Sequence, residues 1–134
     1  MLNLKDNDLF RQQCYINGSW QDADSGEAID VTNPATGEKL GTVPKMGADE
    51  TRRAIEAAEN AFLSWRKTTA YEKSQVLRRW FELMMEHKED LSIIMTAEQG
   101  KPINESRGEI NYAASYIEWF AEEARRVYGD TVPA

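Results

Sequence analysis

The stretch INESRGEINYAASYIEWFAEEARRVY, residues 103–128, has apolar side chains on two sides of one expected helix. Its first stripe has small members that let a neighbouring helix approach closely, and consists of Ile110, Ala113, Ala114, Ile117, Ala121 and Ala124. At 100° per residue, Tyr112, Tyr116 and Trp119 form a second stripe roughly opposite Ile110. Phe120 joins the two stripes. We expect such a helix to be covered on both sides, the aromatic one by another domain, another subunit or a ligand tunnel.

Three shorter helices are expected before this stretch. Asp49 is a candidate N-cap for the first, and Thr69 with Glu72 forms a capping-box pattern at the second. Gly100 is expected to end the third helix and Pro102 to open the next, so residues 96–106 indicate a helix stop and restart. The apolar positions expected to share a face are Ile55, Ala58, Phe62 and Trp65 in the first helix, Val76, Leu77, Trp80, Phe81 and Met84 in the second, and Leu91, Ile94 and Met95, with Glu98, in the third.

Residues 1–45 are expected to form two β-hairpins. In CYINGSW, residues 14–20, Asn17-Gly18 supplies the positive φ angles of a type I′ turn. A second pair is predicted from 28–33 and 39–45, joined by the turn NPATGE at 33–38. Because these strands are short and half polar, they need a partner surface.

Charge and composition narrow the function classes. The 134 residues have a net charge of −7 and no basic cluster, which argues against nucleic acid and against an anionic membrane surface as partners. The sequence shows neither a signal-peptide core nor an apolar run of membrane-spanning length. A single cysteine is simplest to explain in a reducing, cytoplasmic setting.

The residues alone indicate no catalytic constellation. Cys14 lies at the start of a predicted strand with no histidine nearby, so a nucleophilic role is not favoured. His87, at an expected helix end, and Lys101, after a helix stop, are best explained as surface residues. No glycine-rich phosphate-binding motif occurs, and the carboxylates of EHKED, residues 86–90, indicate a solvated helix junction.

Five landmarks follow one another along the chain: YINGSW, VTNPATGEKLGTVP, AIEAAENAFLSWRKT, AEQGKP and YIEWFAEEARRVYGDTVP. In this order they resemble the N-terminal part of the aldehyde dehydrogenase superfamily, from about residue 10 to the end. LFRQQ, VPKMGADETR and WFELMMEH are most similar to its bacterial succinate-semialdehyde dehydrogenases. The resemblance implies an α/β fold in a longer protein with a cofactor-binding domain, a catalytic domain and an oligomerisation arm.

Within that fold, the resemblance implies that residues 1–134 are one N-terminal segment, mainly α-helical with two short hairpins. Residues 1–45 would form the hairpins, and residues 46–134 would be helices bordering the cofactor-binding domain and the substrate tunnel. The whole protein would use NAD or NADP and a small-molecule aldehyde, and would be a homo-oligomer. Its catalytic cysteine and glutamate and its cofactor site would lie beyond this sequence, and Cys14 does not match the nucleophile's motif.

The resemblance implies functional roles for a few residues of this chain. The positions that line the family's substrate tunnel correspond to Gly108 and Tyr112, with Tyr116 and Phe120 as neighbours. Some members bind a monovalent cation at positions that match backbone carbonyls of Val31 or Thr32 and the carboxylate of Glu98, which are the oxygen ligands that a hard cation prefers.

The sequence therefore predicts two alternative functions. In the first, the parent protein oxidises succinate semialdehyde to succinate, and the 134-residue chain alone is inert. In the second, the chain is a stand-alone helical interaction module whose contact surface is Tyr112, Tyr116 and Trp119. The reading frame after Ala134 distinguishes them.

Overall fold

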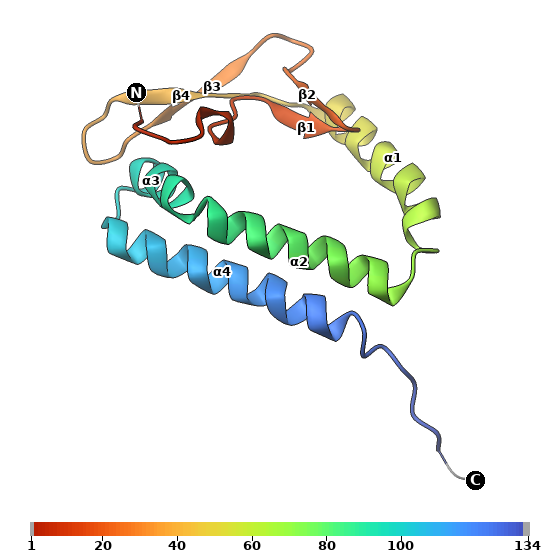
Figure 1. Cartoon of the computed structure of the whole chain (residues 1–134). Helices are drawn as coiled ribbons and strands as arrows, with labels where there is room; N and C mark the ends of the chain where they lie inside the picture. The colour runs from red at the N-terminus through yellow and green to blue at the C-terminus, as the bar shows by residue number, and fades with distance from the viewer. Residues whose placement is uncertain (1, 133–134) are drawn as a thin grey trace.

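A computed structural model describes residues 2–132. It contains two separate antiparallel hairpins followed by four α-helices (Figure 1). A 3-10 turn, η1 (Asn7–Leu9), precedes them. The strands are β1 (Cys14–Ile16), β2 (Ser19–Gln21), β3 (Ala28–Thr32) and β4 (Lys39–Pro44), and the helices are α1 (Ala48–Trp65), α2 (Ala70–Glu86), α3 (Lys88–Gln99) and α4 (Ile103–Glu123). The mainly helical architecture with two N-terminal hairpins confirms the expected fold of this segment.

Both predicted hairpins are present. In the first, Tyr15 pairs with Trp20 across the strands, and the turn residues Asn17 and Gly18 have φ angles of 51° and 79°. These positive values are what a type I′ turn requires. In the second hairpin Ala28 pairs with Pro44, and the register shifts between Val31 and Thr32. The two hairpins form separate sheets, so each depends on the helices or on its own turn for support.

The helix boundaries follow from capping chemistry. Thr69 and Glu72 form the predicted reciprocal box at α2: the Glu72 carboxylate accepts from the Thr69 N–H at 2.7 Å, and the Thr69 hydroxyl accepts from the Glu72 N–H at 3.2 Å. The expected N-cap at Asp49 is wrong. α1 begins at Ala48 with Gly47 as its N-cap, because the Glu50 carboxylate accepts from the Gly47 N–H at 3.0 Å.

The helix predicted over 103–128 ends at Glu123. The N–H groups of Arg125 and Arg126 then bond to the carbonyls of Glu122 and Glu123, which tightens the chain into a last turn. The small-residue stripe that faces α2 stops at this point, and Val127 is almost fully exposed. A helix continued to residue 128 would therefore gain no packing from the described residues.

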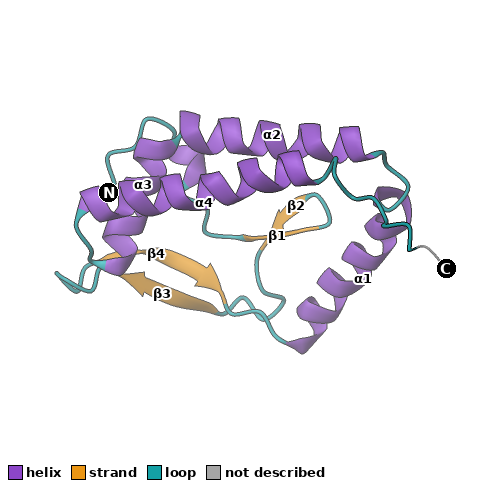
Figure 2. Ribbon diagram, turned by 90° about the horizontal axis from the view of Figure 1, so that it is seen from below, coloured by secondary structure: helices purple, strands orange, loops and turns teal. Residues whose placement is uncertain are grey.

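The packed centre lies between α2, α3 and α4, where α2 and α4 run antiparallel and side by side (Figure 2). Ala114 and Ala121 of the first predicted stripe are 0% and 1% exposed, and Ile110 is also buried. Ala113, predicted in the same stripe, is exposed, because it lies away from the contact of α4 with α2 and α3. Ser106 is fully buried and bonds to the Thr96 hydroxyl at 2.8 Å. The small residues of α4 thus allow the close helix contact that the sequence indicated.

The apolar stripes of α1 and α2 are only partly covered. Leu77, Phe81 and Met84 are half-buried, but Trp80 is 55% exposed and Val76 is similarly exposed. Ile55, Phe62 and Trp65 of α1 are also exposed. α1 packs mainly against β1, and it diverges from α2 at the loop that joins the two helices (Figure 1). It therefore does not cover the apolar stripe of α2.

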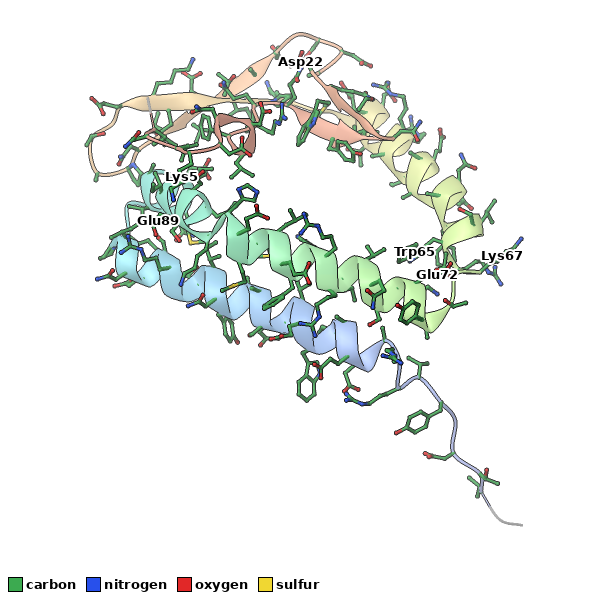
Figure 3. All side chains as sticks on the ribbon, in the orientation of Figure 1. Lys5, Asp22, Trp65, Lys67, Glu72 and Glu89 are labelled. Carbon is green, nitrogen blue, oxygen red and sulfur yellow. The ribbon has the colours of Figure 1, made fainter. Side chains whose placement is uncertain are left out.

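Two buried carboxylates attach the N-terminal region to the helices. Asp90 on α3 accepts from the N–H groups of Asp6 at 2.8 Å and Lys5 at 3.1 Å, and these bonds hold the pKa of Asp90 below its ordinary value. Figure 3 shows Lys5 beside Glu89 in this region. Glu50 also accepts from the Asp24 N–H at 3.0 Å, which links the loop after β2 to the start of α1.

Among residues 2–132, no helix has both the length and the apolar character that crossing a bilayer requires.

Candidate functional site

The four predicted tunnel residues follow one another at four-residue intervals on α4. Gly108, Tyr112, Tyr116 and Phe120 therefore lie along one side of the helix. All four are exposed, and Tyr112 and Tyr116 are 64% and 50% exposed. Because the opposite side of α4 is buried against α2 and α3, this aromatic side is free within the described part of the chain.

An open groove of about 560 Å³ follows this side of α4. Its walls include three of the four predicted residues, namely Tyr112, Tyr116 and Phe120, together with Trp119. Gly108 lies outside the groove, and a Cβ atom at this position would meet nothing within 4 Å. The structure therefore brings the aromatic residues together and places Gly108 on the open surface one turn before them.

Tyr112 and Tyr116 form a single polar unit within this aromatic wall. Their hydroxyl oxygens are 2.7 Å apart and hydrogen-bonded, and their rings meet edge to face with centroids 4.9 Å apart. The hydrogen bond with Tyr112, and secondarily burial, raises the pKa of Tyr116 above its ordinary value. Tyr116 therefore remains a neutral phenol at neutral pH.

Charged residues border the groove farther along α4. Glu118 and Glu122 line it, and both reach Arg78 of α2, at 2.8 and 3.5 Å. Ser115 also lines the groove, while its hydroxyl donates to the Tyr112 carbonyl at 2.7 Å. None of Ser115, Glu118 and Glu122 was predicted from the sequence as a residue of this site. The available signal was helical spacing, because Ser115 lies three residues after Tyr112, and Glu118 and Glu122 follow Ser115 at intervals of three and four residues.

The residues proposed for a cation lie in two segments that approach each other. Val31 and Thr32 flank the register shift in β3, and Glu98 is exposed in the last turn of α3. The segments meet just beyond these residues, since a Cβ atom on Gly100 would lie 2.9 Å from Cγ of Pro34. Among residues 2–132 no cluster of three or more His, Cys, Asp or Glu side chains is placed to hold a metal ion. Cation binding at Val31, Thr32 and Glu98 stays a prediction.

The remaining candidates occupy structural positions. Cys14 is a half-buried free thiol in β1, and His87 forms the boundary between α2 and α3. Lys101 pairs with Glu109 of α4. Glu89 receives two hydrogen bonds from Arg107, at 3.0 and 2.5 Å, which lower the pKa of Glu89. This pair ties the start of α3 to α4.

The sequence and the fold together identify the class of protein. The model of the aldehyde dehydrogenase family matches residues 20–134, and the chain belongs to this family, corresponding to its N-terminal segment. A succinate-semialdehyde dehydrogenase from Burkholderia pseudomallei superimposes with a TM-score of 0.96 at 59% identity, over 98% of this chain and 27% of that one.

Two curated relatives, both semialdehyde dehydrogenases, are similar to this chain along almost its whole length. The chain is 67% identical over 132 residues to glutarate-semialdehyde dehydrogenase of Pseudomonas putida, covering 98% of this chain and 28% of the relative. It is 65% identical over 132 residues to the NADP(+) succinate-semialdehyde dehydrogenase of Escherichia coli, covering 98% and 27%. The chain thus spans little more than a quarter of the length of these relatives.

Proposed function

We propose that the whole protein is an NAD(P)-dependent aldehyde dehydrogenase that oxidises a short semialdehyde with a carboxylate at its far end. Succinate semialdehyde, oxidised to succinate, and glutarate semialdehyde are the two candidate substrates. The observation that carries this proposal is the identity of 65–67% to dehydrogenases of these two substrates along 98% of the chain. The choice between them rests on residues that line the substrate path.

In this proposal residues 1–134 form one wall of the substrate path and carry none of the bond-making groups. The aromatic side of α4 is suited to that position, because Tyr112, Tyr116 and Phe120 present apolar rings with hydroxyl groups at one place. Such a mixture of aromatic walls and a few placed polar groups is typical of small-molecule sites. Gly108 would leave room one turn earlier.

The first prediction concerns activity. The complete gene product should reduce NAD⁺ or NADP⁺ when either semialdehyde is added, whereas purified residues 1–134 should show no rate above buffer. Absorbance of the reduced nicotinamide at increasing aldehyde concentration measures both, and kcat/KM ranks the two aldehydes and the two cofactors.

Cys14→Ser is the matched variant for this experiment, because it removes the only thiol in the chain. It should leave the rate of the complete protein within about two-fold, since Cys14 is placed in a strand away from the groove. Loss of activity in Cys14→Ser, or aldehyde oxidation by residues 1–134 alone, would contradict the assignment.

The interaction module remains the second candidate, because Tyr112, Tyr116 and Trp119 are exposed on one helix. Aromatic side chains of this kind are enriched at binding surfaces. Sequencing of the gene beyond the codon for Ala134 separates the proposals: a stop codon there favours the module, and an open frame that continues into a dehydrogenase favours the enzyme.

A further inference from the structure

The hydrogen bond between Tyr112 and Tyr116 has a consequence for what the groove can recognise. Two phenols carry two O–H protons, and the bond of 2.7 Å between their oxygens uses one of them. The pair therefore keeps one proton to donate to another molecule. Both tyrosines are at least half exposed and line the groove, so this proton is accessible from the groove side of α4.

The remaining proton is a better donor than that of a lone tyrosine. The phenol that accepts the internal bond is polarised by it, and hydrogen bonds in a chain strengthen one another. The neighbouring wall is formed by the rings of Trp119 and Phe120, so the tyrosine pair is a polar point on a largely aromatic surface.

The free O–H of the tyrosine pair favours one chemical class of ligand. A carboxylate accepts hydrogen bonds about twice as strongly as a neutral group, so a single polarised O–H distinguishes an anionic oxygen from a methyl or hydroxyl group. Glu118 and Glu122 lie farther along α4, and their negative charges would repel the carboxylate of a ligand at that end of the groove. Arg78 offsets part of this charge. An anionic group is therefore best accommodated beside the tyrosines.

We propose that Tyr112 and Tyr116 act as one specificity-determining unit, in which the free O–H binds the carboxylate of the semialdehyde and thereby favours acidic over uncharged aldehydes. This inference rests on the proposed function. It assigns the tyrosines to substrate selection and gives them no part in the oxidation itself. A single remaining hydroxyl keeps its own proton but loses the polarisation by its partner, so removing one hydroxyl should weaken the carboxylate contact and removing both should abolish it.

The experiment uses the complete protein with Tyr112→Phe, Tyr116→Phe and the double variant. Each change removes one hydroxyl and keeps the ring. For each variant kcat/KM is measured with succinate semialdehyde and with butanal, which has the same number of carbon atoms and no charge, and likewise with glutarate semialdehyde and pentanal. The ratio of acidic to uncharged aldehyde isolates the carboxylate contact from any general effect on folding or on the chemistry.

The double variant should lower this ratio roughly 10- to 100-fold, which is the range for losing one hydrogen bond to a charged group. The loss should appear mainly in KM, because the contact is made equally in the ground state and the transition state. Each single variant should lower the ratio by a smaller factor, because the remaining phenol can still donate its own proton but is no longer polarised by its partner.

Tyr128→Phe is the matched control, since Tyr128 follows α4, is 80% exposed and lies outside the groove. It should leave the ratio unchanged. An active protein whose ratio is unchanged in both single variants or in the double variant, or which loses the same factor for both aldehydes of a pair, overturns this inference and leaves the proposed function standing. A wild-type protein that oxidises none of the four aldehydes overturns both.

Discussion

At the scale of single residues, Gly100 combines a positive φ angle with a close neighbour, which no other glycine of the described chain does. Its φ of 72° is in the left-handed region, where it ends α3, and its N–H bonds to the Thr96 carbonyl at 2.9 Å. A Cβ atom there would also lie 2.9 Å from Pro34 Cγ. One residue thus serves both the end of a helix and the contact between the 33–38 turn and the helices.

Gly100→Ala should destabilise the chain by about 1–2 kcal/mol, because an L-residue in the left-handed region is strained and the added methyl group meets Pro34. Chemical denaturation followed by circular dichroism measures the change. Gly108→Ala is the matched control with the opposite sign. It lies inside α4 with open space around the new Cβ atom, so it should stabilise by about 0.5–1 kcal/mol. Equal effects of the two substitutions would contradict this explanation.

At the scale of elements, the contact of α4 with α2 and α3 decides the packing of the helices. Its centre has small side chains, since Ala114 and Ala121 are fully buried. Arg78 of α2 reaches Glu118 of α4 at 2.8 Å beside this contact. Shape therefore sets the approach of the helices, and the partly exposed ion pair adds little to stability.

Ala114→Leu should cost about 1–3 kcal/mol, because three extra carbon atoms must be placed where no space is left between the helices. Ala113→Leu makes the same chemical change at the neighbouring, exposed position and should cost less than about 0.5 kcal/mol. Thermal unfolding of the two variants gives the comparison. A similar loss in both would show that α4 does not pack through its Ala114 side.

At the scale of the whole molecule, the buried apolar surface is small and the exposed apolar surface is large. The buried apolar residues among those described are only Ala23, Ala97, Ile110, Ala114 and Ala121. Large exposed side chains occur on α1, α2 and the aromatic side of α4, including Phe62, Trp65, Trp80 and Trp119. Extended apolar surface of this kind is normally covered by another chain or domain.

Purified residues 1–134 should therefore self-associate as their concentration rises. Light scattering should give a mass that increases from 15.3 kDa to at least twice that value. Because the chain has a net charge of −7, added salt should promote the association by screening repulsion between copies. A constant mass of 15.3 kDa at all concentrations and salt levels would contradict the prediction.

Local features were predicted well because their hydrogen bonds join residues close in sequence. The turn at Asn17-Gly18, the capping box of Thr69 and Glu72, and the helix end at Gly100 all agree with the structure. Of the candidate site, the alignment of Tyr112, Tyr116 and Phe120 follows from helical periodicity. The direct bond between the two tyrosine hydroxyls depends on their side-chain rotamers, which periodicity does not specify.

The sequence by itself determined the elements, their order, the two-sided character of α4 and the family of the chain. The tertiary structure decided which apolar surfaces are covered. It buried Ile110, Ala114 and Ala121 of the first stripe of α4 but left Ala113 exposed. It also exposed Trp80 and the stripe of α1, and made Gly47 rather than Asp49 the N-cap of α1. The physical reason is distance along the chain: a turn or cap is made by neighbours within about four residues, whereas burial depends on what lies opposite, as with Arg78 and Glu118, 40 positions apart.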